Sequence, residues 1–306
     1  MSSFRLLLVS VLALAAIDTA TATDSLVSTE WLESKLNDPA VHILEVSVNP
    51  GVYERGHIPG ASNLVWHTDL VDPTRRDIVD GERLQELLRA AGVNKDSTIV
   101  LYGDTNNWFA AWGFWILDVY GLGEQTRLLD GGRAKWEAEN RPLSPRPRRA
   151  AAGNVTIGED RQSELRARLT DVVAAAEDPS TSALLDIRSP AEYSGRIIAP
   201  EGVQELAIRA GHVPGAVNVP WGALVAEDGT FKSADDIRAI YAEHGIDGST
   251  PIIAYCRIGE RSSHSWFALR HILGYDARNY DGSWTEYGNA VGVPISNPAG
   301  TIWQGK

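Results

Sequence analysis

The chain has 306 residues, 43% of them hydrophobic, which is enough for two ordinary domains with packed cores. Its 40 acidic residues outnumber 28 basic ones and give a formal net charge of −12. This balance argues against a nucleic-acid-binding surface, because phosphate contacts need clustered lysines and arginines, and any useful positive charge is expected inside a pocket.

The first 22 residues are typical of a secretory signal peptide. Arg5 precedes an apolar run from Leu6 to Ile17, and the small residues Ala20 and Ala22 follow. The run is too short to span a bilayer as a helix, and no later segment approaches that length. We therefore expect residues 1–22 to be removed and the mature protein to be exported, periplasmic or secreted, with no membrane span.

Residues 25–139 and 161–306 are predicted to be two copies of one domain. "GHIPGA" and "GHVPGA", "STIVLYG" and "STPIIAYC", and "LLDGG" and "NYDGS" recur in the same order at a nearly constant offset. In each copy short apolar runs alternate with helical patterns, which predicts an α/β fold with a mainly parallel sheet flanked by helices. Residues 140–160, which begin with a Pro- and Arg-rich stretch, are predicted to be a linker.

The helices and strands of the copies have recognisable ends. In the first copy, "GERLQELLRAAG" predicts a helix that ends at Gly92. In the second, "ALLDI" and "PIIAY" predict buried strands, and "SADDIRAIYAEHG" predicts a helix capped by Ser233 and ended by Gly245. In a parallel sheet the ligand crevice lies beyond the carboxyl ends of the strands. That is where Cys256 comes, directly after "PIIAY".

Cys256 is the only cysteine of the chain, so it cannot form an internal disulfide. A lone cysteine is often a small buried hydrophobe. Here, however, Arg257 and Arg261 flank it in a short loop before a predicted helix, and Gly259 permits a tight turn. Such a loop can turn its N–H groups inward as an anion-binding nest. The positive field favours the nucleophilic thiolate and attracts an anionic substrate.

The motifs "CRIGERSS", "GHIPGA", "GHVPGA", "LLDIRSPAEY" and "NYDGSWTEYGN" together resemble those of a two-domain rhodanese, a thiosulfate sulfurtransferase. The resemblance covers Ser25 to Pro294 and implies ping-pong covalent catalysis. Cys256 would take the outer sulfur of thiosulfate as a persulfide and pass it to cyanide or a thiol. The resemblance places the cradle for that sulfur in the backbone of Arg257, Ile258, Gly259, Glu260 and Arg261. For the Glu260 side chain we expect either a pair with a neighbouring arginine or a place in solvent.

The resemblance also places Asp186 and Arg188 near the loop. Asp186 could act there or only tie loops together, and Arg188 is expected to pair with Glu192. Trp284 could wall the pocket or pack beneath it. An arginine that some family members use in the "SPAEYSG" region to hold substrate is replaced here by Glu192 and Tyr193.

The first copy is expected to be noncatalytic, because it has Gly103 where the second has Cys256. It would form one side of the cleft, where Trp108, Trp112 or Trp115 could reach. The "GH-x-PGA" histidines, His57 and His212, recur in both copies although only one copy has a cysteine. We therefore expect them to shape a turn and take no part in catalysis.

Three other functions are compatible with a reactive cysteine in this loop. The first is a phosphatase or arsenate reductase, but tyrosine-phosphatase-like loops resemble Cys-x5-Arg, whereas the loop from Cys256 to Arg261 is one residue shorter. A 3-mercaptopyruvate sulfurtransferase shares the chemistry, but its loop tends to read "CGSG". A non-enzymatic persulfide carrier or redox sensor would stall after one equivalent of sulfur.

No cofactor and no metal are expected, since the seven histidines show no metal-ligand spacing and "GLG" at Gly121 lacks a dinucleotide-binding context. The expected partners are a small anionic sulfur donor and a thiol or cyanide acceptor, and not a nucleic acid or a membrane. The sequence carries no signal for the oligomeric state.

Overall fold

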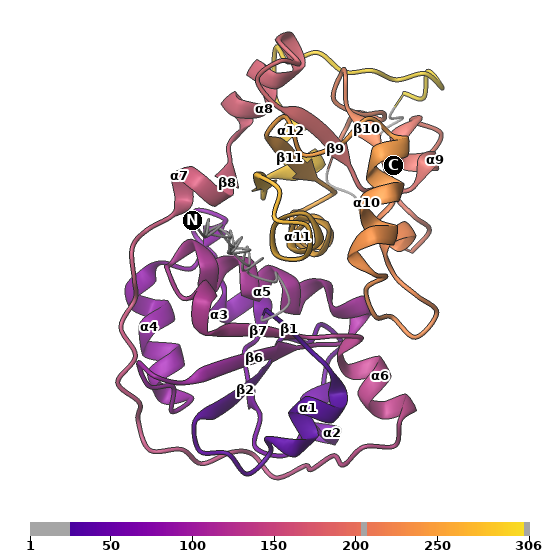
Figure 1. Cartoon of the computed structure of the whole chain (residues 1–306). Coiled ribbons are helices and arrows are strands. Elements are labelled where there is room, and N and C mark those ends of the chain that lie inside the picture. The colour runs from indigo at the N-terminus through magenta and orange to yellow at the C-terminus, as the bar shows by residue number, and fades with distance from the viewer. Residues whose placement is uncertain (1–24, 203–206, 303–306) are drawn as a thin grey trace, which may run out of the picture.

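The computed structural model describes residues 25–202 and 207–302, so the predicted signal peptide lies outside the described residues. Figure 1 shows two α/β domains, the first in indigo and magenta and the second in orange and yellow, that meet along a pair of helices. Within the described ranges, no helix is long and apolar enough to cross a membrane.

The first domain holds one parallel sheet, a short antiparallel hairpin and the surrounding helices. Its strands are β1 Leu26–Val27, β2 Val41–Glu45, β3 Ser62–Asn63, β4 Val71–Asp72, β5 Asp77–Ile78, β6 Thr98–Tyr102 and β7 Thr126–Leu129. Its helices are α1 Thr29–Ser34, α2 Val52–Arg55, α3 Trp66–Asp69, α4 Gly81–Ala90, η1 Thr105–Asn107, α5 Trp108–Val119, η2 Gly123–Gln125 and α6 Gly132–Ala138.

The second domain has a sheet of the same kind. Its strands are β8 Arg166–Ala167, β9 Ala183–Asp186, β10 Val217–Asn218, β11 Ile252–Tyr255 and β12 Ala277–Tyr280. Its helices are α7 Gln162–Leu165, α8 Leu169–Glu177, α9 Pro190–Tyr193, η3 Trp221–Leu224, α10 Ala234–Glu243, α11 Glu260–Phe267, η4 Ala268–Ile272 and α12 Ser283–Tyr287.

The two sheets have the same topology. The order is β1-β7-β6-β2-β3 in the first and β8-β12-β11-β9-β10 in the second, and neighbouring strands are parallel. Every strand of one sheet therefore has a counterpart in the other at the same place. The prediction of tandem α/β domains with mainly parallel sheets is confirmed.

Local signals set the ends of the predicted helices. Ser233 caps α10 by accepting the N–H of Asp236 at 3.2 Å, as the capping motif predicts, and Gly245 follows with φ +75°. In the first domain α4 ends at Ala90, and Gly92 has φ +86° just beyond it. Both stops use the left-handed conformation that glycine adopts without a steric penalty.

Helices α5 and α11 join the domains. Each follows the central strand of its sheet, and they lie against each other between the domains in Figure 1. The α5 sequence "WFAAWGFWILDV" is apolar on all sides because neighbours surround it, and Phe114 reaches Phe267 with ring centroids 5.0 Å apart. One hydrophobic core runs through both domains as a result.

The predicted linker, residues 140–160, runs along the first domain without a helix or strand apart from an isolated bridge at Ser144. Val155 on this segment is fully buried, and its N–H bonds to the carbonyl of Val93. The segment is therefore packed against the domain that it leaves.

His57 and His212 occupy equivalent turns. Their rings stack on Tyr53 and Tyr193 with centroids 3.8 and 3.7 Å apart, and each Nδ1 lies within 2.9 Å of that tyrosine's carbonyl oxygen. Both histidines are buried and fixed in the turn. This arrangement agrees with the turn-shaping role that their recurrence predicts.

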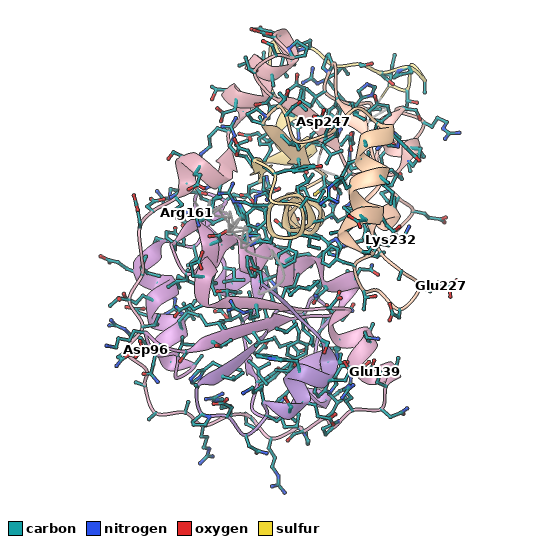
Figure 2. The ribbon with its side chains drawn as sticks, viewed as in Figure 1. Asp96, Glu139, Arg161, Glu227, Lys232 and Asp247 are labelled. Atoms are coloured by element: carbon teal, nitrogen blue, oxygen red, sulfur yellow. The ribbon has the colours of Figure 1, made fainter. Side chains whose placement is uncertain are left out.

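Negative charge lies on the outer surface. Figure 2 shows Asp96 and Glu227 at opposite edges of the ribbon, and both are exposed, as is Asp247. The surplus of acidic residues is therefore compatible with arginines gathered around a pocket.

Candidate active site

Cys256 sits where the sequence predicts, at the carboxyl end of the central strand β11 and before α11. It is fully buried, and the loop between the two elements spans only Cys256 to Gly259. Gly259 has φ +99°, and its N–H lies 3.2 Å from Cys256 Sγ. A fixed backbone donor at this position can stabilise negative charge on the sulfur.

A polar network holds Gly259 in this conformation. Its carbonyl oxygen accepts hydrogen bonds from the hydroxyls of Ser262 and Ser263, both at 2.9 Å, and from Nδ2 of Asn279 at 3.2 Å. The Ser262 hydroxyl also lies 2.6 Å from Asn279 Oδ1. These three side chains are fully buried, so the network fixes the loop through bonds that water does not weaken.

The segment after β12 is hydrogen-bonded to the backbone of Cys256. The N–H of Cys256 donates to Ser283 Oγ at 3.0 Å, and that hydroxyl lies 2.7 Å from the carbonyl of Tyr280. The N–H of Trp284 donates to the Cys256 carbonyl at 3.1 Å. Ser283 has φ +49°, unusual for a residue with a side chain, so its placement is enforced by the surrounding contacts.

A cavity of about 310 Å³ lies over the loop, between the two domains. The second domain contributes Arg257, Ile258, Glu260, Asp281 and Gly282, and the first contributes Trp66, His67, Val71, Arg76, Asp77 and Trp112. Cys256 lies behind this lining with no exposed surface, so a donor must displace a lining side chain to reach the sulfur. The cavity combines aromatic walls with charged groups, as small-molecule sites commonly do.

The first domain is tied to this cavity by hydrogen bonds. Trp112 Nε1 donates to Asp281 Oδ1 at 3.0 Å, and Arg166 binds both Asp281 Oδ2 at 3.1 Å and Asp77 at 2.6 Å. Trp112 thus reaches the cleft as expected. Trp108 lies near Arg261, 5.9 Å from ring centroid to guanidinium, whereas Trp115 is fully buried in the core.

Arg261 does not line the cavity. It pairs with Glu192, which is 3.0 Å away and also accepts the Ser189 N–H. Burial opposes the charge of Arg261, but Cys256 and Glu192 raise its pKa above the ordinary value. The charge of Arg261 is therefore largely neutralised by Glu192 and attracts a free donor less than the sequence predicts. The arginines that line the cavity are Arg257 and Arg76.

Arg188 pairs with Asp186 rather than with Glu192, so the expected partner was wrong. The pair is completely buried, with Arg188 Nη2 2.7 Å from the Asp186 carboxylate and 2.7 Å from the carbonyl of Gly211. The guanidinium lies 4.6 Å from the Trp284 ring centroid. These three residues pack beneath the loop and none lines the cavity, which favours the supporting roles for Asp186 and Trp284.

Glu260 meets neither expectation for its side chain. It is only 4% exposed, so it does not face solvent. Within the described residues it forms no ion pair, because Arg261 turns to Glu192 and leaves the Glu260 carboxyl beside Cys256.

The equivalent loop of the first domain is closed to this chemistry. A Cβ at Gly103 would lie 2.2 Å from the carbonyl oxygen of Val46, so the backbone fills the space that a cysteine would need. The Gly103 N–H donates to Asn107 Oδ1, whereas the N–H of Cys256 donates to Ser283 Oγ. Gly103 is therefore required sterically, which supports a noncatalytic role for this domain.

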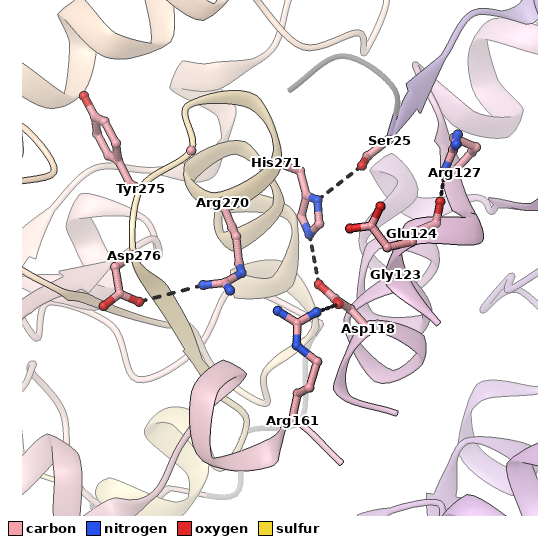
Figure 3. Close-up of a pocket in the computed structure, with 11 residues that line it drawn as sticks. Ser25, Asp118, Gly123, Glu124, Arg127, Arg161, Arg270, His271, Tyr275 and Asp276 are labelled. Carbon is pink, nitrogen blue, oxygen red and sulfur yellow. Dashed lines mark hydrogen bonds and ion pairs between the residues drawn. The ribbon is translucent and has the colours of Figure 1, made fainter. Parts of the chain in front are cut away.

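A larger cavity of about 550 Å³ lies elsewhere at the domain junction. Figure 3 shows that its charged groups face one another: His271 links Ser25 and Asp118, and Asp118 also binds Arg161. None of the sequence-predicted site residues lines it. In the described part of the chain, no group of three or more His, Cys, Asp or Glu side chains is placed to hold a metal ion.

The fold and the cysteine loop define a class of two-domain α/β protein in which one domain carries a cysteine at the end of its central strand. Sequence comparison identifies it: the Rhodanese-like domain family matches residues 28–139 and 168–290, and the chain belongs to this family. The family resemblance seen in the sequence is therefore confirmed.

Individual relatives agree with this assignment. A protein of Mycolicibacterium smegmatis named "Putative thiosulfate sulfurtransferase" is 50% identical over 275 residues, covering 89% of this chain and 98% of the relative. Sulfur carrier protein TtuD of Thermus thermophilus is 46% identical over 275 residues, covering 89% and 96%. The protein is thus a sulfurtransferase of the rhodanese family.

Solved structures share the fold. SseA from Escherichia coli, described with the 3-mercaptopyruvate sulfotransferases, superposes with a TM-score of 0.72 at 28% identity, covering 85% of this chain and 98% of SseA. EanB in complex with hercynine gives a TM-score of 0.76 at 23% identity, covering 89% and 69%, which is a likeness of fold alone.

Several residues of the site were not predicted from the sequence. Ser262 and Ser263 belong to "CRIGERSS", and Asn279 and Ser283 belong to "NYDGSWTEYGN", yet no local pattern marks these four residues as hydrogen-bond partners of Gly259 and Cys256. Asp281 is one residue before Gly282 in the "NYDGS" segment, and only the approach of the first domain makes it part of the cavity.

Proposed function

We propose that the protein moves the outer sulfur of thiosulfate to a thiophilic acceptor, cyanide or a thiol, through a persulfide on Cys256. The observation that carries this proposal is the Gly259 N–H, held 3.2 Å from Cys256 Sγ at the carboxyl end of β11. It offers a fixed donor to the negative charge that Sγ carries as the attacking thiolate and carries again when the acceptor releases it.

The reaction has two halves. The Cys256 thiolate attacks the outer sulfur of thiosulfate, a new S–S bond forms, and the old S–S bond breaks with its electron pair leaving on sulfite. The acceptor then attacks the outer sulfur of the persulfide, and the Cys256 thiolate is released. Arg257 and Arg76 line the cavity through which the anionic donor would approach.

The donor is tested by what leaves the enzyme. Purified protein is given thiosulfate or 3-mercaptopyruvate with cyanide, and sulfite and pyruvate are measured. We expect sulfite release to exceed pyruvate release, with none of either from Cys256→Ser. Dominant pyruvate release would favour 3-mercaptopyruvate as the donor, in line with the similarity to SseA, which is described with the 3-mercaptopyruvate sulfotransferases.

A carrier is a second candidate, favoured by the 46% identity to Sulfur carrier protein TtuD. Mass spectrometry after thiosulfate exposure should show one added sulfur atom on Cys256 for either function. We expect many turnovers with a small acceptor. A stop after one equivalent would support a carrier that discharges only to a partner protein.

We also propose that the protein is exported, on the basis of residues 1–22. Expression of the full chain should give a mature protein whose first residue follows Ala22, found outside the cytoplasm. An unprocessed chain retained in the cytoplasm would contradict this.

A further inference from the structure

Glu260 is a buried carboxyl that the reaction above does not use. It is the first residue of α11 and follows Gly259, whose N–H points at the sulfur. Glu260 Oε2 has no hydrogen-bond partner among residues 25–202 and 207–302. A buried polar atom left in this state costs about 1–3 kcal/mol, so this carboxyl is not there for stability.

The side chain belongs to the wall of the catalytic cavity. Glu260 lines it together with Arg257 and Ile258 from the same loop. A sulfur donor that enters the cavity to reach Cys256 therefore passes along the loop residue that carries this buried carboxyl.

The surroundings of Glu260 favour the protonated form of its carboxyl. Burial is the main cause that raises its pKa well above the ordinary value, and the charges of Cys256 and Asp281 raise it further, while Arg257 opposes them. From the first domain, Arg76, Asp77 and His67 line the same cavity. A neutral carboxylic acid is a proton donor, whereas an ionised one would repel an anionic substrate.

We propose that the Glu260 carboxyl protonates the sulfite that leaves when Cys256 takes the outer sulfur of thiosulfate. This step rests on the proposed sulfur transfer. As the S–S bond of thiosulfate breaks, the Glu260 proton moves to the departing group, which leaves as hydrogen sulfite, and Glu260 becomes a carboxylate. An acceptor thiol then returns a proton to Glu260 as its sulfur attacks the persulfide. With cyanide as acceptor, water restores the proton.

Proton delivery addresses the difficult part of the first half-reaction. Sulfite that leaves unprotonated carries two negative charges into a cavity beside Asp281 and Asp77. Protonation removes one of those charges as it develops. Positioned general acids contribute about 10²–10⁴-fold to such steps.

The test compares two donors that differ in the basicity of the leaving group. Thiosulfate releases sulfite, whereas an aryl thiosulfonate releases a sulfinate, a much weaker base that gains little from a proton. In single turnovers with full-length protein, persulfide formation on Cys256 is followed for the wild type, Glu260→Gln and Glu243→Gln. Glu243 is an exposed glutamate on α10, so its variant controls for the loss of one charge.

We expect Glu260→Gln to slow persulfide formation about 10²-fold with thiosulfate and less than about threefold with the thiosulfonate. The wild-type rate with thiosulfate should fall at high pH as Glu260 ionises, and this fall should be missing from Glu260→Gln. Glu243→Gln should match the wild type with both donors.

Equal rates for Glu260→Gln and the wild type, or equal losses with both donors, would overturn the proposal. If Glu260→Gln does not fold, the wild type alone decides, because the ratio of thiosulfate to thiosulfonate rates must fall as pH rises. A wild type that forms no persulfide with either donor would instead refute the sulfur transfer itself.

Discussion

Gly259→Ala tests the geometry of the loop most directly. Gly259 has φ +99°, and an added Cβ would lie 2.7 Å from the carbonyl oxygen and 2.9 Å from the Cα of Asp281. The left-handed conformation costs a non-glycine residue about 1–2 kcal/mol, and overpacking against backbone adds about 1–3 kcal/mol. We expect the free energy of unfolding to fall by about 2–5 kcal/mol, measured by urea titration.

Gly245→Ala is the matched control. Gly245 has φ +75°, but nothing lies within 4 Å of an added Cβ, so this variant should lose only the conformational part, about 1–2 kcal/mol. Gly259→Ala should also form the Cys256 persulfide about 10²-fold more slowly, since the N–H moves away from Sγ. Equal destabilisation of the two variants together with full activity of Gly259→Ala would refute this reasoning.

Three further variants probe buried charges and supports. Burial raises the pKa of Asp130 to about 6, so its ionisation lowers the stability of the fold as pH rises from about 4 to 6. In urea titrations, Asp130→Asn should therefore increase the free energy of unfolding by about 1 kcal/mol at pH 8 and by little at pH 4. Equal increases at the two pH values would contradict this. Arg188→Met should lose about 3–5 kcal/mol because Asp186 stays buried without its partner, and Arg188→Met with Asp186→Leu should recover most of the loss. Ser283→Ala should lower the free energy of unfolding by about 1–2 kcal/mol, measured by thermal unfolding, and should slow persulfide formation. An unchanged rate would show that this hydroxyl does not contribute to the function of the loop.

Much of the fold could be predicted because it depends on local signals. The capping serine of α10, the glycine stop after α4 and the apolar strand β11 act within a few residues of themselves. The repeated motifs then predict the topology, since two copies of one pattern fold into two similar sheets. The position of Cys256 after β11 follows from the same reasoning.

Partner choice among charged residues could not be predicted. From the sequence, Glu192 could pair with either Arg188 or Arg261. Arg188 could also pair with Asp186, which is two residues before it. The tertiary structure brings Glu192 of α9 to Arg261 of α11, with the carboxylate 3.0 Å from the guanidinium. Among residues 25–202 and 207–302 Glu260 then forms no ion pair, which no pattern in "CRIGER" reveals.

The sequence by itself determined that the chain has two similar α/β domains, that only one of them has a cysteine, and that Cys256 lies at the end of a strand. These properties depend on periodicity, capping and residue identity, which are local. The tertiary structure decided which residues surround the sulfur. Trp112, Asp77 and Arg76 reach the cavity from a domain more than a hundred residues away in the chain, because packing of α5 against α11 brings the two domains together.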